Sequence, residues 1–181
     1  MKITHFATGN INKLKEVSRI LGYEITQFKC DLPETQDIEI EPIILEKAKA
    51  AFELAGEPIL VEDTGLFCSA WNGFPGGLIK WEMQTTGNAG IIKKLDGFSD
   101  RSGQAVTIFG FWDGEKLVFA KGITKGTIAT EILGDTEFGW DPIFIPDGGG
   151  GLSFAQMIPE MKDEFSMRRK ALEELNIKIQ E

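Results

Sequence analysis

The chain has 181 residues, enough to bury a sizeable core, and the whole span 1–181 is predicted to form a single domain. An apolar fraction of 42% excludes disorder, and no apolar run approaches the roughly 18 residues of a membrane span or resembles a signal peptide. We therefore expect a cytoplasmic protein with reduced Cys30 and Cys68 and without a membrane partner. The net charge of −9 excludes a general nucleic-acid binder, and a nucleotide ligand would need local lysines and arginines, a divalent cation, or both.

Apolar periodicity predicts strands that alternate with helices in the first part of the chain and a β-meander later. The predicted strands cover residues 2–7, 23–28, 59–61 and 104–130, and the predicted helices cover residues 14–21, 45–55, 91–95 and the stretch from about 164 onward. Gly22 and Gly56 are placed to end the first two helices, and Asp113-Gly114 predicts a hairpin turn. This pattern predicts an α/β fold built on a mixed sheet, in which ligands tend to bind at the carboxyl ends of strands.

The segment between the first strand and the first helix has the composition of a phosphate cradle. It reads Thr8-Gly9-Asn10-Ile11-Asn12-Lys13. Gly9 allows unusual backbone conformations, free N–H groups at a helix start attract anions, and Lys13 adds a positive charge. The other interpretation is an ordinary helix start capped by Asn10 or Asn12.

Two adjacent acids, Glu62 and Asp63, follow the apolar residues 59–61. Since side chains alternate along a strand, the two acids should face opposite ways, and one can point into a cleft. A carboxylate in a cleft can bind Mg²⁺ or accept a proton from water, whereas a solvated strand end is the alternative. The segment Asp31-Leu32-Pro33-Glu34 could supply a second oxygen ligand.

Three further segments carry candidate ligand-binding residues. Lys80 follows a Gly- and Pro-rich turn and would suit a phosphate, or would lie exposed beside a core Trp81. The run Phe138-Gly139-Trp140-Asp141 could stack an aromatic ring on a base, or could be core aromatics entering a strand. Lys162 and the pair Arg168-Arg169 could meet a carbonyl or phosphate, or form a solvated helix face.

The order of these motifs along the chain resembles the inosine triphosphate pyrophosphatase family. The resemblance covers about residues 3 to 175, and its most specific parts are Glu62-Asp63-Thr64-Gly65-Leu66 and Phe138-Gly139-Trp140-Asp141-Pro142. It implies an elongated α/β fold with a long mixed sheet flanked by helices, two lobes, a nucleotide cleft between them, and a homodimer. It also implies Mg²⁺-dependent hydrolysis of purine nucleoside triphosphates such as ITP, dITP and XTP to the monophosphate and pyrophosphate.

The resemblance also implies roles for individual residues. Glu34 and Asp63 would hold Mg²⁺, and Asp63 would also accept the proton of the attacking water. The remaining implied residues would bind the substrate, with residues 8–13 at the phosphates: Thr8, Gly9, Asn10, Ile11, Asn12, Lys13, Lys47, Thr64, Lys80, Phe138, Gly139, Trp140, Asp141, Lys162, Met167 and Arg168.

One departure from the family pattern concerns base recognition. The family commonly has Ser-His-Arg where this chain has Ser166-Met167-Arg168, so the contact of the histidine has no counterpart in the Met167 side chain. Two other functions are compatible with the same motifs: a pyrophosphatase for other modified nucleotides, and a catalytically silent nucleotide-binding regulator. Retention of both Glu34 and Asp63 argues against the silent regulator.

Overall fold

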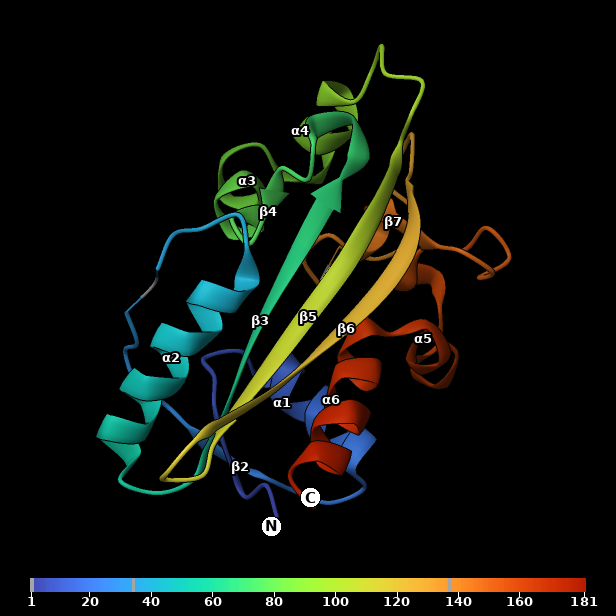
Figure 1. Ribbon diagram of the computed structural model, residues 1–181. Coiled ribbons are helices and arrows are strands. Elements are labelled where there is room, and N and C mark those ends of the chain that lie inside the picture. Colours follow the sequence, from blue (N-terminus) through green and yellow to red (C-terminus); the bar gives the residue numbers. More distant parts are fainter. Residues whose placement is uncertain (1, 34, 137) are drawn as a thin grey trace.

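A mixed β-sheet forms the centre of the computed structural model, which describes residues 2–33, 35–136 and 138–181. The strand order is β2-β1-β3-β5-β6-β7, and the short β4 pairs with β3 (Figure 1). The pairs β1–β2 and β1–β3 are parallel, whereas the pairs along β3, β5, β6 and β7 are antiparallel. The predicted mixed α/β fold is therefore confirmed.

The elements follow the chain in this order. The strands are β1 (His5–Ala7), β2 (Thr26–Phe28), β3 (Ile59–Cys68), β4 (Pro75–Gly76), β5 (Ser102–Trp112), β6 (Leu117–Ile128) and β7 (Phe144–Pro146). The α-helices are α1 (Ile11–Leu21), α2 (Ile40–Ala55), α3 (Ile79–Thr85), α4 (Gly87–Lys94), α5 (Pro159–Phe165) and α6 (Met167–Lys178). Short 3₁₀ helices span Ser69–Trp71, Asp141–Ile143 and Phe154–Gln156.

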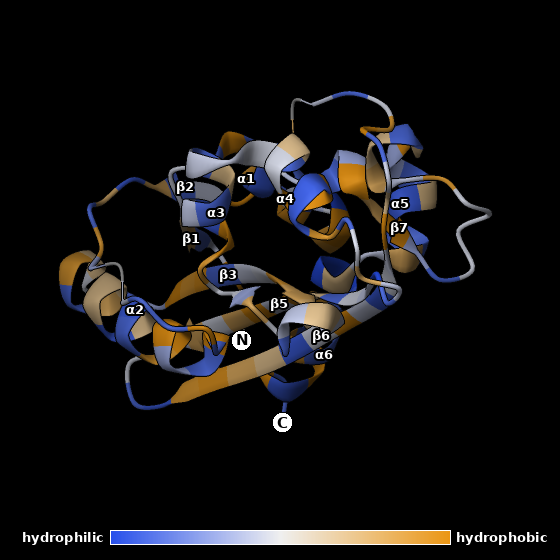
Figure 2. Ribbon diagram, turned by 90° about the horizontal axis from the view of Figure 1, so that it is seen from above, coloured by the Kyte–Doolittle hydropathy of each residue, from blue (hydrophilic) through white to orange (hydrophobic). Residues whose placement is uncertain are grey.

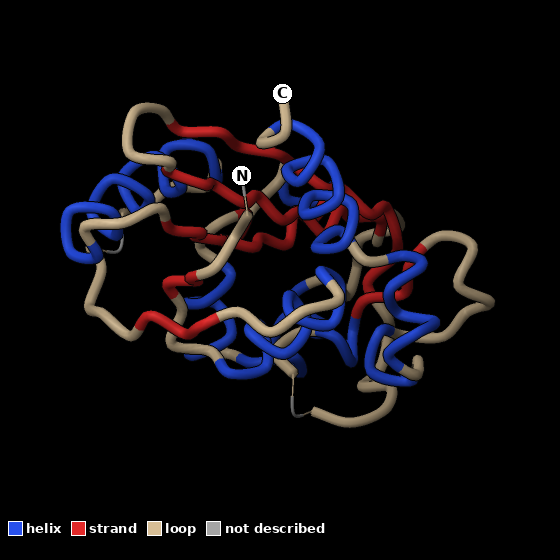
Figure 3. The backbone as a smooth tube through the Cα atoms, turned by 90° about the horizontal axis from the view of Figure 1, so that it is seen from below, coloured by secondary structure: helices blue, strands red, loops and turns tan. Residues whose placement is uncertain are grey.

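Helices cover both faces of the sheet because its central strands are apolar on both sides (Figure 3). Alternation along β3 sends Ile59 and Val61 toward α2, and sends Leu60 toward α1 and α6. Strands β5 and β6 carry mostly hydrophobic colours in Figure 2, whereas α2 shows both colours, as expected for a helix with one buried face. We refer to this end of the sheet, with β1, β2, α1, α2 and α6, as the first lobe.

The long strands β3, β5 and β6 extend past the end of β1 into a second lobe (Figure 1). This lobe contains α3, α4, α5, β4 and β7, and its core is built on residues such as Leu66, Ile91 and Phe144. Both chain termini lie at the opposite end of the molecule, in the first lobe (Figure 1). No helix in the described part of the chain is long and apolar enough to cross a membrane.

Several predicted boundaries are confirmed, and others differ from the structure. Gly22 and Gly56 end α1 and α2 with left-handed φ values of 75° and 68°, and the 113–116 turn joins β5 to β6. The strand predicted over residues 59–61 continues to Cys68, because β5 pairs with it along its whole length. The C-terminal helical region is two helices, since Ser166 leaves the helical conformation and caps α6 with its side chain.

Candidate functional site

A cleft of about 770 Å³ lies between the two lobes. Its walls contain parts of every motif selected from the sequence, namely Thr8, Gly9, Asn10, Asn12, Lys13, Lys47, Asp63, Thr64, Lys80, Phe138, Gly139, Trp140, Asp141, Met167 and Arg168. Two of the predicted substrate-binding residues, Ile11 and Lys162, are not among the residues that line it. Glu34 lies outside the described residues, whereas the neighbouring Asp31 lines the cleft.

The segment before α1 is a capped helix start at the edge of the cleft. The Asn10 side-chain oxygen accepts hydrogen bonds from the backbone N–H groups of Asn12 (2.9 Å) and Lys13 (3.3 Å), and the Thr8 hydroxyl accepts one from Asn10 N–H (3.1 Å). The capping interpretation is therefore confirmed. A side chain on Gly9 would meet no atom within 4 Å, so open space remains over this backbone. Ile11 is the first residue of α1, and it is half exposed without lining the cleft.

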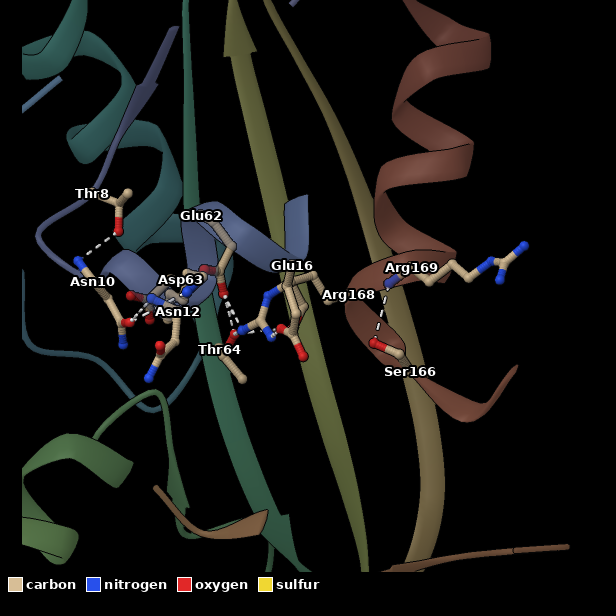
Figure 4. A network of polar contacts seen from close by, with 12 residues as sticks. Thr8, Asn10, Asn12, Glu16, Glu62, Asp63, Thr64, Ser166, Arg168 and Arg169 are labelled. Atoms are coloured by element: carbon tan, nitrogen blue, oxygen red, sulfur yellow. Dashed lines mark hydrogen bonds and ion pairs between the residues drawn. The ribbon is translucent and has the colours of Figure 1, made fainter. Parts of the chain in front are cut away.

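Glu62 is a buried anchor for two cations. Strand alternation points it toward α1 and α6, where it pairs with Lys13 at 3.0 Å and Arg168 at 3.4 Å and accepts a hydrogen bond from the Thr64 hydroxyl (Figure 4). Burial alone would raise the pKa of Glu62, but Lys13, Arg168 and Thr64 outweigh it and lower the pKa to about 2. Glu62 is therefore ionised at neutral pH and is paired with both cations.

Asp63 points the other way, toward α2. Its Oδ1 accepts a hydrogen bond of 2.8 Å from Lys47 Nζ, which also donates to the Glu62 backbone carbonyl at 3.2 Å. The Asp63 side chain is 20% exposed, whereas that of Glu62 is completely buried. Of the two adjacent acids, Asp63 is thus the carboxylate that a water molecule or a cation in the cleft can reach, as the alternation of strand side chains predicts.

The described residues offer Mg²⁺ a carboxylate rather than a complete protein cage. No group of three or more His, Cys, Asp or Glu side chains comes together among them. Mg²⁺ is usually bound through one or two carboxylates, with substrate phosphates and water as its other ligands. A partly exposed Asp63 in the same cleft as Lys13 and Lys47 fits this mode of binding.

Residues 138–141 form a turn on the second lobe, which we call the aromatic turn. It presents Phe138 and Gly139 to the cleft. Phe138 is half-buried, and Gly139 has a left-handed φ of 54° and open space over its Cα. Trp140 is buried and packs edge-on against Phe144 at 5.7 Å between ring centroids. The interpretation as a core aromatic is therefore right for Trp140, and Phe138 is the less buried of these two rings in the cleft lining.

Charged groups support this turn from behind. Lys162 Nζ lies 2.5 Å from Asp141 Oδ2, 3.0 Å from Glu16 Oε1 and 4.4 Å from the centroid of the Phe138 ring. Lys162 and Asp141 are buried, so they hold the turn in place rather than forming an open anion site. The expectation that Lys162 contacts the nucleotide is not matched by the residues that line the cleft.

Arg168 is the most buried cation of the site, and its neighbour Arg169 is not part of it. Arg168 is 1% exposed and donates to Glu16, to Glu62 and to the Thr64 hydroxyl, whereas Arg169 points away and pairs with Glu173 on the surface (Figure 4). A solvated helix face is thus correct for Arg169 and wrong for Arg168. The Arg168 Nε atom is buried without a hydrogen-bond partner among the residues described.

Glu16 is the member of this network that sequence reasoning missed. It bridges Arg168 and Lys162 from α1, and although burial would raise its pKa, these two cations lower it. A signal existed, because Glu16 follows Lys13 by three residues and both therefore lie on one face of the helix. A buried partner on the opposite side was needed to distinguish it from an ordinary surface glutamate.

The last two predicted residues have contrasting surroundings. Lys80 is exposed and lies 5.4 Å from the ring centroid of Trp81, which is itself 46% exposed and not in the core. Met167 is 2% exposed and belongs to the core of the second lobe. It is also one of the residues that line the cleft. At this position the cleft therefore meets an apolar side chain.

The fold and the cleft define a two-lobed α/β protein whose cleft gathers cations, an exposed carboxylate and an aromatic turn. Within that class the chain belongs to the Ham1 family, whose sequence model matches residues 4–177. It is 41% identical over 172 residues to a dITP/XTP pyrophosphatase of Methanopyrus kandleri, covering 93% of this chain and 91% of that protein.

Two further similarities agree with this assignment. The chain is 41% identical over 181 residues to an inosine triphosphate pyrophosphatase of Yarrowia lipolytica, covering 97% of this chain and 95% of that protein. Among solved structures, a HAM1 protein from Coxiella burnetii aligns with a TM-score of 0.83 and 26% identity over 99% of both chains. The resemblance drawn from the order of the motifs is thereby confirmed.

Proposed function

We propose that this chain hydrolyses non-standard purine nucleoside triphosphates, such as ITP, dITP and XTP, to the monophosphate and pyrophosphate. The observation that carries the proposal is the position of Asp63. This partly exposed carboxylate lies in one cleft with the capped start of α1 and the Phe138–Gly139 turn. The names of the Methanopyrus and Yarrowia relatives support the same activity.

The proposed binding mode places the triphosphate at the first lobe. Lys13 and Lys47 lie beside the carboxylates there, and Lys80 lines the same cleft from α3. Two opposite charges about 4 Å apart attract by roughly 4 kcal/mol at an effective dielectric near 20. Salt screens the repulsion between the substrate and the net charge of −9 within about 8–10 Å, so a few lysines close to the substrate can outweigh this repulsion. When bound at Asp63, and at Glu34 as the resemblance implies, Mg²⁺ would neutralise phosphate oxygens.

The chemical step assigned to the protein is a proton transfer. Asp63 accepts a proton from a water molecule as that water attacks the α-phosphorus in line, and the α–β bond breaks to release pyrophosphate. Lys47 holds the Asp63 carboxylate in its orientation, and the Lys13 ammonium group stabilises the charge of the leaving group.

The base is proposed to lie against Phe138 and Gly139. Hypoxanthine and xanthine carry a carbonyl at the position where adenine has an amino group, so a donor in the cleft favours them over adenine. Arg168 supplies N–H donors behind this turn, whereas the Met167 thioether supplies none. We further propose that the chain acts in the cytoplasm as a homodimer of single-domain subunits, as expected from the resemblance.

A panel of triphosphates tests the proposed function. ITP, dITP, XTP, GTP, ATP and the pyrimidine triphosphates are incubated with and without Mg²⁺, and the products are identified. We expect kcat/KM for ITP and XTP to exceed that for ATP by about a hundredfold or more, with monophosphate and pyrophosphate as products. Asp63→Asn should abolish turnover while the thermal melt stays cooperative.

The contrary outcomes of the panel are distinct. Turnover of pyrimidine or other modified triphosphates in place of ITP would retain the chemistry and contradict the purine preference. Binding of ITP without hydrolysis would identify a nucleotide-binding regulator. Near-normal turnover in Asp63→Asn would remove this carboxylate from the mechanism.

A further inference from the structure

Asn88, the second residue of α4, contacts the backbone of the aromatic turn. Its Nδ2 donates a hydrogen bond of 3.0 Å to the backbone carbonyl of Gly139, and the residue is 9% exposed. It is not one of the residues that line the cleft. Its Oδ1 is buried and has no hydrogen-bond partner among the residues described, so the bond to Gly139 is the polar contact this amide makes there.

The carbonyl that Asn88 holds belongs to the least constrained residue of the turn. Gly139 has a left-handed φ of 54°, and a Cβ atom there would meet nothing within 4 Å. A backbone hydrogen bond of 3.1 Å, from Asp141 N–H to the Phe138 carbonyl, closes the turn. Because a peptide unit is planar, fixing the Gly139 carbonyl also fixes the direction of the Trp140 N–H and limits rotation of the turn.

We infer that Asn88 is a positioning residue for base recognition, an inference that rests on the proposed function. It acts through Gly139, keeping the glycine backbone and the Phe138 ring at the angle at which a purine can lie flat against them. The phosphate end of the cleft is built by other elements, since Lys13 comes from α1 and Lys47 from α2. Loss of the Asn88 bond should therefore weaken binding of the base and leave binding of the phosphates intact.

Two substitutions and a control on the same helix test this inference. Asn88→Asp preserves size but places an acceptor against the Gly139 carbonyl, and Asn88→Ala removes the contact. Lys93→Ala changes an exposed residue of α4. KM and kcat for ITP and ATP are measured together with inhibition by inorganic tripolyphosphate, which carries the phosphates but no base.

In both Asn88 variants, KM for ITP should rise on the order of tenfold while kcat changes much less, which is the effect of losing one hydrogen bond. The ITP-to-ATP ratio of kcat/KM should fall, and the inhibition constant of tripolyphosphate should stay that of the parent. Lys93→Ala should match the parent throughout.

Three outcomes would overturn the inference. The first is that KM for ITP and the ITP-to-ATP ratio of kcat/KM stay unchanged in both variants. The second is that binding of ITP and binding of tripolyphosphate weaken equally. The third is that both variants fail to give a cooperative thermal melt, which would show a purely structural role. If the parent itself hydrolyses no triphosphate, the proposed function fails, and the inference fails with it. Failure of the inference alone is recognised by normal ITP hydrolysis in the parent and in both Asn88 variants.

Discussion

Two adjacent carboxylates illustrate how strand geometry separates tasks at the scale of single residues. Glu62 is buried between Lys13 and Arg168, whereas Asp63 is partly exposed beside Lys47. The sequence alone predicted opposite directions for these side chains but not which one would face the cleft. That choice depends on the helices that pack on each face of β3. Helix α2 supplies Lys47 on the side of Asp63, whereas α1 and α6 supply Lys13 and Arg168 on the side of Glu62.

The low pKa of Glu62 has a consequence for stability that can be measured. The folded value of about 2 lies below the reference value of 4.5, so the contribution of this group is present above about pH 4.5 and is lost as the pH falls toward 2. A shift of this size corresponds to about 3 kcal/mol. Glu62→Gln should be less stable than the parent at neutral pH, and this difference should shrink on acidification.

Urea unfolding at a series of pH values measures the effect. Glu173→Gln is the matched control, because Glu173 is an exposed partner of Arg169 on α6 and its contribution should be small at every pH. A difference between the parent and Glu62→Gln that does not change with pH would contradict the assignment of an ionised, charge-stabilised Glu62.

At the scale of elements, the attachment of α6 to the sheet depends on a glycine. A Cβ atom at Gly122 on β6 would lie 1.9 Å from the Met167 carbonyl oxygen and 2.6 Å from the Ala171 nitrogen. These are backbone atoms of α6, so the helix would have to move as a whole. Since α6 begins at Met167 and Arg168, its distance from the sheet also sets the position of the cation behind the base site.

Gly122→Ala should therefore destabilise the protein by about 3 kcal/mol, the upper part of the usual cost of overpacking, and should lower turnover of ITP. Lys125→Ala, on the exposed face of the same strand, should change stability by less than about 0.5 kcal/mol. Urea unfolding of the two variants measures the difference. Parent-like stability in Gly122→Ala would show that α6 can shift freely on β6.

The elements differ in how far the sequence could predict them. Helices α1 and α2 are long, amphipathic and followed by glycines, so their local signals suffice. The second lobe contains α3, α5, β4 and β7, which are too short for a periodic pattern to identify and are stabilised mainly by tertiary contacts. The extension of β3 to Cys68 was missed because its pairing with β5 and β4, and not a local pattern, defines it.

The candidate site shows the same division. The motif residues could be selected because polar groups followed predicted strands, and most of them line one cleft. Glu16 and Asn88 could not be selected, because each acts through a partner far away in the sequence, Arg168 and Gly139 respectively. Burial of Trp140 was equally unpredictable, since adjacent aromatics give no indication of which ring faces the core.

At the scale of the whole molecule, a strongly acidic chain places cations and carboxylates side by side where its two lobes meet. The net charge is −9, and in the described part of the chain the cleft is lined by four cations and four acids, namely Lys13, Lys47, Lys80 and Arg168 with Asp31, Glu62, Asp63 and Asp141. The long strands β3, β5 and β6 pass through both lobes (Figure 1). In the proposed function, these cations attract the anionic substrate locally although the net charge of the chain is negative.

The central claim, attack of water on the α-phosphorus, is tested most directly by isotope labelling. ITP is hydrolysed in water that carries a heavy oxygen isotope, and the masses of both products are determined. The proposed chemistry predicts one heavy oxygen in the inosine monophosphate and none in the pyrophosphate. Heavy oxygen in the pyrophosphate, or release of inosine diphosphate and phosphate, would contradict it.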